Sequence, residues 1–303
     1  METNKSKVPL EAILLYNDYA HGVISRRAFM QGVQNLAIGG LTAATLIEAL
    51  MPKYAEGQQI ARNDERLETS YETVPSPNGN GSIRGYLVRP KSADTREATA
   101  SKLPGIIVVH ENRGLNPHIE DIARRLALEN FMTFAPDGLT SLGGYPGDDY
   151  KGGQLFNKID KGKMFEDMVA SAQWLKARPD CTGKIGVTGF CYGGSVSNML
   201  AVRLGSDLSA AAPYYGAPPK PEEIAKIKAA ILVHQAALDT RLAPTWPVYD
   251  KELTAAGIPH EGYVYPNAVH GFNCDATPER YNPEAAALAW GRTTGWFKKY
   301  VSA

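Results

Sequence analysis

Residues 184–194 read KIGVTGFCYGG, and this stretch decides the fold that we expect. An apolar, strand-like run ends in a G-x-C-x-G motif centred on Cys191, and residues compatible with a helix follow directly. In the G-x-S-x-G form of this motif, the nucleophile sits on a strained strand-to-helix turn, and the flanking glycines leave room for neighbouring backbone. The sequence therefore predicts a nucleophile elbow that carries a thiol. Taken alone, the motif leaves a glycine-rich turn around a buried cysteine equally open.

An acid and a histidine follow Cys191 in the chain order that such an elbow requires. Asp239 comes four residues after the apolar run 229–235, and His270 lies in the loop after a second strand-like run, 261–266. An isolated aspartate or histidine is more often a solvated loop residue. Three such residues in this order, each after a strand, predict a catalytic triad of Cys191, His270 and Asp239.

The sequence resembles the dienelactone hydrolase (carboxymethylenebutenolidase) family of the α/β-hydrolase superfamily. The resemblance spans roughly residues 70–300 and rests on the elbow, the Tyr214-Tyr215-Gly216 turn, Asp239, the pair His270 and Phe272, and an alanine-rich tail at 281–296. It implies an α/β-hydrolase fold and hydrolysis of small esters or lactones through a thioester, with no cofactor. The alternatives are acyl transfer or peptide cleavage on the same fold, and a non-catalytic binding protein with that fold.

The resemblance also implies roles for residues around a strand that ends at Glu111. In the family, the residue matching Glu111 holds the resting thiol, and the backbone N–H groups matching Asn112 and Tyr192 form the oxyanion hole. A cysteine has an ordinary pKa near 8.5 and must be ionised to attack, and a nearby carboxylate disfavours the thiolate. Glu111 is therefore expected to keep the thiol protonated until substrate displaces it. A surface carboxylate is the alternative interpretation.

Four residues are candidates for binding the substrate. Because the family's substrates are small anions, Arg113 and Arg280 are candidates for gripping a carboxylate, although either can equally be a surface arginine. Tyr215 and Phe272, with the loop 143–153, are candidates for an apolar lining, and aromatic residues in loops are often only packing.

Composition and apolar patterning indicate an α/β protein that acts on a small molecule. The 303 residues are 44% hydrophobic and carry 32 basic and 32 acidic side chains, so no charge excess favours nucleic acid. Apolar runs alternate with helical stretches, which predicts a mostly parallel sheet with helices on both faces. These runs are 103–109, 131–136, 184–188, 210–215, 229–235 and 259–265, preceded by a turn-rich hairpin at 71–88. A homo-oligomer remains open.

The first 60 residues differ from the catalytic domain expected at 61–303. The sequence SRRAFM at 25–30 precedes an uncharged, moderately apolar stretch at 28–47, a pattern that resembles a twin-arginine export signal and favours a periplasmic or exported protein. The alternative is a helical hairpin, capped by Ser25, that packs on the catalytic domain or a partner subunit of a cytoplasmic protein. The stretch is too interrupted for a stable membrane span.

The remaining cysteines and histidines add no motif. The chain has three cysteines, and their spacings match no zinc site, so no metal is expected. His110 and His234 lie in or at the end of apolar strands and are interpreted as hydrogen-bonded core histidines. Cys274 is interpreted as a buried, inert cysteine close to the site. The other histidines, His21 among them, have no chemical context in the sequence.

Overall fold

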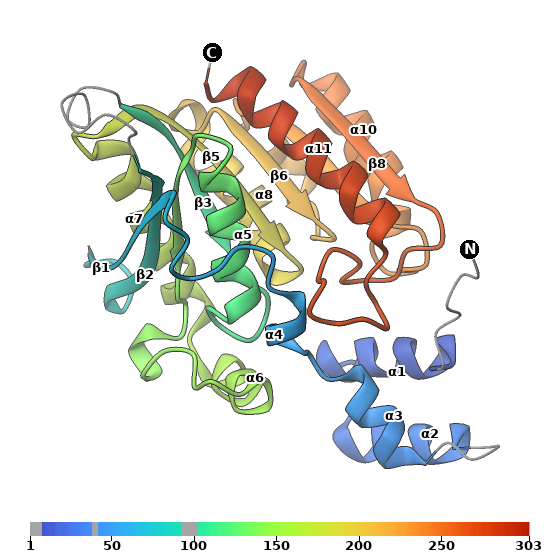
Figure 1. The fold of residues 1–303 in the computed structure, drawn as a ribbon. Helices are drawn as coiled ribbons and strands as arrows, with labels where there is room; N and C mark the ends of the chain where they lie inside the picture. The colour runs from blue at the N-terminus through green and yellow to red at the C-terminus, as the bar shows by residue number, and fades with distance from the viewer. Residues whose placement is uncertain (1–7, 38–41, 92–101, 303) are drawn as a thin grey trace.

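The computed structural model describes residues 8–37, 42–91 and 102–302. An eight-stranded sheet runs through the molecule in the order β1-β2-β4-β3-β5-β6-β7-β8 (Figure 1). β1 and β2 form the expected antiparallel edge, and the strands from β3 to β8 run parallel to one another. The strands are β1 (Leu67–Ser76), β2 (Gly81–Pro90), β3 (Leu103–Val109), β4 (Met132–Pro136), β5 (Cys181–Phe190), β6 (Ala210–Tyr214), β7 (Ala230–Ala236) and β8 (His260–Tyr265). This arrangement confirms the predicted fold class.

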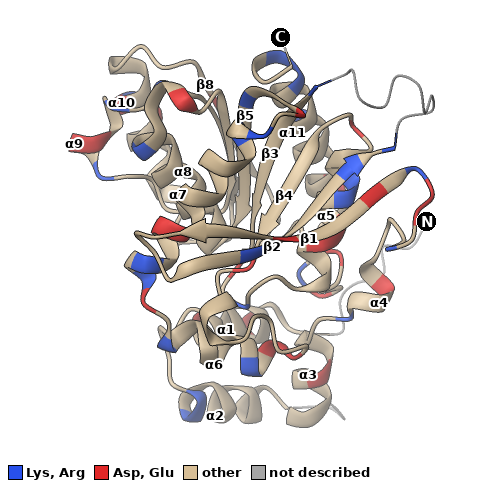
Figure 2. Cartoon of the chain, turned by 90° about the vertical axis from the view of Figure 1, so that its left-hand side faces the viewer, with Lys and Arg blue, Asp and Glu red and all other residues tan. Residues whose placement is uncertain are grey.

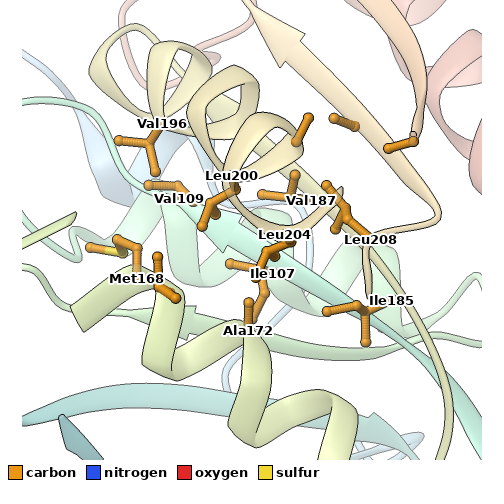
Figure 3. Packing of buried hydrophobic residues seen from close by; sticks show 14 of the residues in the cluster. Ile107, Val109, Met168, Ala172, Ile185, Val187, Val196, Leu200, Leu204 and Leu208 are labelled. Carbon is orange, nitrogen blue, oxygen red and sulfur yellow. The ribbon is translucent and has the colours of Figure 1, made fainter. Parts of the chain in front are cut away.

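Helices cover both faces of the sheet because the parallel strands are apolar on both sides. Successive residues of β3 show this: Ile107 packs with α7 and α8, whereas Ile106 packs with α5 and α11. Figure 3 shows the first of these two layers, in which Leu200 and Met168 lie over Ile107. The helices of the catalytic domain are α5 (Pro117–Ala127), α6 (Asp149–Lys158), α7 (Lys161–Ala177), α8 (Tyr192–Leu204), α9 (Pro221–Ile224), α10 (Trp246–Ala255) and α11 (Pro283–Tyr300), with three short 3-10 helices at 140–142, 205–207 and 243–245.

The observed boundaries match several predicted elements. The apolar run 103–109 is β3, and β5 extends the predicted strand 184–188 at both ends. The prediction of a loop at 143–153 is partly wrong, because its last residues form the first turn of α6. The Asp148 side chain caps that helix by accepting a hydrogen bond from the Lys151 N–H.

The N-terminal extension, residues 8–57 as far as the structure describes them, consists of four helices. They are α1 (Leu10–Ala20), α2 (Arg26–Leu36), α3 (Ala43–Leu50) and α4 (Tyr54–Gly57). Ser25 caps α2 by accepting a hydrogen bond from the Ala28 N–H. Residues 38–41 of the stretch expected to act as an export signal lie outside the described residues. Among the helices that are described, none combines the length and apolar character needed to cross a membrane.

The extension lies against the carboxyl edge of the sheet (Figure 1). Its small apolar core includes Ile13, Phe29 and Leu46, and this core packs against Val269 and Leu238 of the catalytic domain. Val269 precedes His270 and Leu238 precedes Asp239, so the extension contacts the loops that carry two of the predicted triad residues. Figure 2 shows positions of basic residues (blue) and acidic residues (red) interspersed along the chain.

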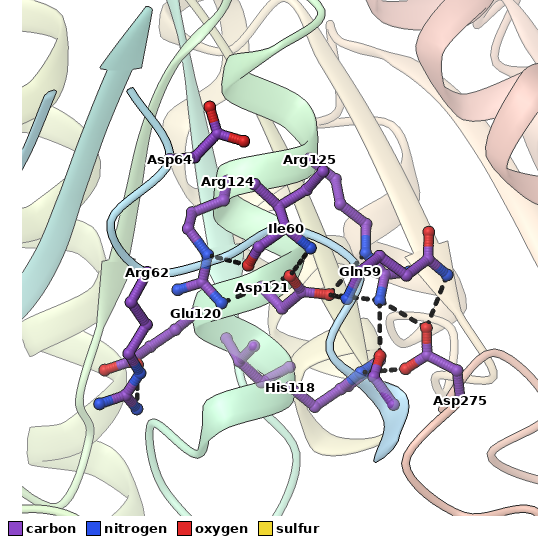
Figure 4. Close-up of polar contacts among 12 residues, drawn as sticks. Gln59, Ile60, Arg62, Asp64, His118, Glu120, Asp121, Arg124, Arg125 and Asp275 are labelled. Carbon is purple, nitrogen blue, oxygen red and sulfur yellow. Dashed lines mark hydrogen bonds and ion pairs between the residues drawn. The ribbon is translucent and has the colours of Figure 1, made fainter. Parts of the chain in front are cut away.

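A polar network fastens the segment after α4 to the catalytic domain (Figure 4). The Asp121 carboxylate on α5 accepts hydrogen bonds from the N–H groups of Gln59 and Ile60, at 3.1 and 2.8 Å. Arg125, one turn further along α5, pairs with both Asp121 and Asp275. The segment that follows the extension and the loop that follows His270 are therefore held to the same helix.

Candidate active site

Cys191 occupies the turn between β5 and α8 in a conformation that non-glycine residues rarely adopt. Its φ is 58° and its ψ is −111°, and such strain is typical of a nucleophile held at a functional turn. A Cβ atom on Gly189 would lie 2.2 Å from the Gly193 carbonyl oxygen, and one on Gly193 would lie 2.3 Å from the Val109 carbonyl oxygen. Only glycine fits at these two positions, which explains why the G-x-C-x-G sequence produces this turn.

His270 and Asp239 meet at the carboxyl edge of the sheet. Asp239 follows β7 and His270 follows β8, and His270 Nδ1 lies 2.6 Å from Asp239 Oδ2. The Leu238 N–H donates a hydrogen bond of 3.0 Å to the Ala268 carbonyl, so the two loops are also joined through their backbones. Burial raises the pKa of the Asp239 carboxyl, but the hydrogen bond and charge of His270 outweigh burial and lower it. An ionised Asp239 therefore fixes the proton of His270 on Nδ1.

His21, at the end of α1, completes a cluster of three potential metal-ligand atoms, which are the Cys191 sulfur and one ring nitrogen each of His21 and His270. His21 Nε2 lies 3.1 Å from Cys191 Sγ and 3.1 Å from His270 Nε2. All three donor atoms lie within 4.8 Å of one another. His21 Nδ1 bonds the Asn17 carbonyl oxygen at 2.5 Å. The structure thus brings Cys191, His270 and Asp239 together as the sequence predicts, and it adds a second imidazole from the N-terminal extension.

The thiol and the His270 imidazole are poised to form an ion pair. Burial raises the pKa of the Cys191 thiol, but the charges and hydrogen bonds of His270 and His21 outweigh burial and lower it to about 6. Burial lowers the pKa of His270, and the Cys191 thiolate and the Asp239 carboxylate outweigh that effect and raise it to about 9. Near neutral pH, these shifts favour a thiolate beside an imidazolium.

Glu111, Asn112 and Arg113 line the same cavity as Cys191 and His270. The Asn112 side chain donates a 2.7 Å hydrogen bond to the Ala20 carbonyl, one of the free carbonyls at the end of α1. Tyr192 is the first residue of α8, so its N–H has no acceptor within that helix. The Cys191 sulfur interacts with His21 and His270, and Glu111 lines the cavity without a hydrogen bond to the sulfur among the described residues.

Arg280 also lines this cavity, whereas the two aromatic candidates lie beneath it. The Arg280 guanidinium lies 5.1 Å from the centre of the Tyr16 ring on α1, and its Nε is buried with no hydrogen-bond partner among the described residues. Tyr215 packs against the His270 ring at a centroid distance of 4.8 Å and is fully buried. Phe272 is fully buried below Tyr215. These two residues support the histidine loop and do not line the cavity in this conformation.

The cavity is nearly filled, with a volume of about 20 Å³. A neighbouring cavity of about 120 Å³ lies between α1 and α6 and shares Tyr16 and Arg113 with it. Sequence reasoning missed several lining residues, namely Tyr16, His21, Pro52, Tyr54, Asp149 and Thr277. Four of these belong to the extension, whose position against the site has no signature in the local sequence.

The structure agrees with the interpretation of His110 and His234 and with the burial expected of Cys274. His110 bonds the Glu111 carbonyl and the Gly138 N–H, and His234 bonds the hydroxyls of Tyr265 and Thr293. Both are therefore hydrogen-bonded core histidines. Cys274 is buried at the edge of the cavity, and Cys181 and Cys274 are both free thiols.

Comparisons with known proteins agree with this architecture. The sequence model of the dienelactone hydrolase family matches residues 83–301. The chain is 31% identical to a "Putative carboxymethylenebutenolidase" of Escherichia coli K12, over 78% of this chain and 89% of that protein. It is 48% identical to the "Putative hydrolase fragment YghX" of the same organism, over 40% of this chain and 97% of that protein.

A solved structure is similar over the same region. The crystal structure of a "Putative Dienelactone Hydrolase" from Klebsiella pneumoniae is 29% identical and superposes with a TM-score of 0.66, covering 77% of this chain and 99% of that one. Sequence similarity to the family thus extends across most of the catalytic domain and accompanies the similarity in fold. The chain belongs to the dienelactone hydrolase family of α/β-hydrolases.

Proposed function

We propose that the protein hydrolyses small carboxylic esters or lactones through a thioester on Cys191. The observation that carries this proposal is a strained thiol at the turn between β5 and α8, in a cluster with an imidazole that Asp239 orients. Membership of a hydrolase family supports the same class of reaction.

In the first half of the reaction, the Cys191 thiolate attacks the carbonyl carbon of the substrate. The electron pair displaced onto the carbonyl oxygen is stabilised by the N–H groups of Asn112 and Tyr192, and each such donor typically contributes about 2.7–4 kcal/mol. As the bond to the alcohol oxygen breaks, His270 donates its Nε2 proton to that oxygen. In a lactone, the alcohol stays attached to the acyl group.

In the second half, neutral His270 removes a proton from water, which attacks the thioester carbon. The carbon–sulfur bond breaks and the carboxylic acid leaves, which restores the thiolate and the imidazolium. Glu111 lines the same cavity, where a carboxylate disfavours the charged sulfur, but His270 and His21 lower the pKa of the resting thiol to about 6 in spite of it.

We further propose that the preferred substrates carry a carboxylate. Arg280 and Arg113 both line the cavity. The buried Nε of Arg280 is a donor without a partner, which favours a ligand that accepts a hydrogen bond.

The test is hydrolysis of p-nitrophenyl acetate and of small lactones by wild type and by Cys191→Ala. We expect the variant to fall to the background rate, and wild-type activity in Cys191→Ala would eliminate the mechanism. Cys181→Ser is the matched control, because Cys181 is a buried cysteine outside the cavity, and it should retain activity. Cys191→Ser should be only weakly active, since the site is tuned to ionise a thiol. A non-catalytic binding protein would instead have a Cys191 that reacts with iodoacetamide no faster than Cys181.

A further inference from the structure

We propose that His21, Cys191 and His270 form a binding site for a divalent transition-metal ion of the zinc type. The three residues come from three segments far apart in the sequence, namely the end of α1, the elbow and the loop after β8. His21 Nε2 lies 3.1 Å from both Cys191 Sγ and His270 Nε2, and the three donor atoms lie within 4.8 Å of one another. No cysteine or histidine spacing in the sequence indicates this site.

The hydrogen bonds made by the Nδ1 atoms determine which form of each imidazole ring faces the other. His21 Nδ1 bonds the Asn17 carbonyl and His270 Nδ1 bonds the Asp239 carboxylate, and both of these partners can only accept a hydrogen bond. Each Nδ1 must therefore carry a proton, so that each neutral ring presents a lone pair at Nε2. Two lone pairs 3.1 Å apart repel each other unless a cation lies beside them. A proton on His270 Nε2, as in the imidazolium, bridges a single pair of atoms, whereas a metal ion that replaces this proton contacts all three donors at once.

Two of the three separations between the donor atoms are close to those of tetrahedral coordination, and the third lies within 4.8 Å. With Zn–N bonds of about 2.0 Å and a Zn–S bond of about 2.3 Å, two ligand nitrogens lie roughly 3.3 Å apart, and a nitrogen and a sulfur roughly 3.5 Å apart. The observed 3.1 Å contacts are shorter by a few tenths of an ångström, so small side-chain rotations make room for the ion. The cavity of about 20 Å³ beside these residues is large enough for one water molecule, which would supply a fourth ligand.

The surroundings of the ligands also resemble those of a metal centre. Histidine ligands in proteins usually donate their other N–H to a carboxylate or a backbone carbonyl. Here His270 has a carboxylate partner and His21 has a backbone carbonyl partner. Two imidazoles and a thiolate are ligands that suit zinc and not magnesium or calcium. The charged residues that line the cavity are balanced, with Glu111 and Asp149 opposite Arg113 and Arg280.

An ion at this position would inhibit hydrolysis and hold the extension in place. It would take the sulfur electron pair needed for attack and the Nε2 lone pair needed for proton transfer. It would also bond α1 to the elbow, so that His21 could not move aside for substrate. This inhibitory consequence rests on the proposed function, whereas binding of the metal does not.

The experiment is a titration of the untagged full-length chain, stripped of metal with a chelator, with Co²⁺ and Zn²⁺. Co²⁺ bound by a thiolate gives a sulfur-to-metal charge-transfer absorption, which reports the Cys191 ligand directly. We expect one ion per chain and a weaker affinity by at least about tenfold in His21→Ala. The charge-transfer absorption should disappear in Cys191→Ser and persist in Cys274→Ser, the matched control for a second cysteine at the same cavity.

Equal metal affinity of wild type and His21→Ala would overturn the proposed site. A charge-transfer absorption that survives in Cys191→Ser, or that is lost in Cys274→Ser, would also overturn it. In the activity arm, Zn²⁺ should inhibit ester hydrolysis by wild type at concentrations at least about tenfold lower than for His21→Ala. If the wild type shows no hydrolysis of any ester or lactone, the proposed function fails, and the spectroscopic titration still decides whether the metal site exists.

Discussion

His21 Nε2 lies 3.1 Å from the sulfur of Cys191, although 170 positions separate the two residues in the chain. The imidazole lines the same small cavity as the thiol. In the described conformation, the N-terminal extension is therefore part of the candidate active site. On the proposed function, the His21 ring would have to move for an ester to reach the thiol, because the cavity of about 20 Å³ is too small for a substrate.

Replacing His21 with alanine should raise the pKa of the Cys191 thiol. Burial favours the neutral thiol, and the interactions of His270 and His21 are what lower its pKa to about 6. Removing one of these two partners leaves burial less opposed. The ultraviolet absorbance of the thiolate as a function of pH, with Cys191→Ser as the blank, measures this shift. An unchanged midpoint in His21→Ala would show that His21 does not stabilise the thiolate.

The dependence of kcat/KM on pH should be bell-shaped, with limbs that belong to the Cys191–His270 pair as a unit. The lowered pKa of the thiol means that the thiolate is lost as the pH falls through about 6. The raised pKa of His270 means that the imidazolium is lost as the pH rises through about 9. Initial rates on a neutral ester across this range provide the measurement. A rate that first rises near the ordinary cysteine pKa of about 8.5 would contradict the ion pair.

The same pair contributes to folding stability within that window. A thiol with a lowered pKa stabilises the folded state at high pH, and this contribution is lost as the pH falls through about 6. An imidazole with a raised pKa stabilises the folded state at low pH, and this contribution is lost as the pH rises through about 9. Denaturant unfolding of wild type and Cys191→Ser at several pH values should therefore show the largest difference between the two limits.

Gly193→Ala should destabilise the protein and abolish hydrolysis. The added methyl group would lie 2.3 Å from the Val109 carbonyl oxygen, and backbone there cannot move without displacing the elbow. We expect a loss of about 1–3 kcal/mol or more in the free energy of unfolding. Gly291→Ala is the matched control, because a Cβ at this position in α11 meets no atom within 4 Å and alanine favours a helix by about 0.5–1 kcal/mol. Equal effects of the two substitutions would refute the steric argument.

Much of the catalytic domain could be predicted because its signals are local. The bounds of β3 follow from one uninterrupted apolar run, and those of α11 follow from Asn282 as its cap and Pro283 in its first turn. The elbow could be predicted because three residues within five positions determine the turn. The order of Asp239 and His270 after their strands then predicted which side chains would meet.

The role of His21 could not be predicted, because it depends on how a separate group of helices packs. Contacts of the extension with Val269 and Leu238 bring α1 to the site, and neither contact leaves a pattern in the local sequence. The start of α6 was missed for a different reason. Gly147, Gly152 and Gly153 are typical of a loop, but the cap provided by Asp148 begins a helix there.

The protein isolated from its native cell should retain the N-terminal extension. Loss of the first 57 residues would remove His21 from the site and expose Val269, which is now 6% exposed, together with its neighbours. N-terminal sequencing or an intact mass tests this expectation. A chain that begins near residue 58 would contradict it and support a cleaved export signal.

Arg280→Gln should raise KM for a lactone that carries a carboxylate far more than KM for a neutral ester. The guanidinium lines the cavity, and its buried Nε has no partner among the described residues, so a substrate carboxylate would be its first charged acceptor. A hydrogen bond to a charged group contributes roughly 1.5–3 kcal/mol, which corresponds to about a tenfold to hundredfold change in KM. Arg280→Lys should recover part of the loss, because it keeps the charge but not the planar fork. If both variants impair the two substrates equally, Arg280 supports the packing of α1 through Tyr16 and does not select an anionic substrate.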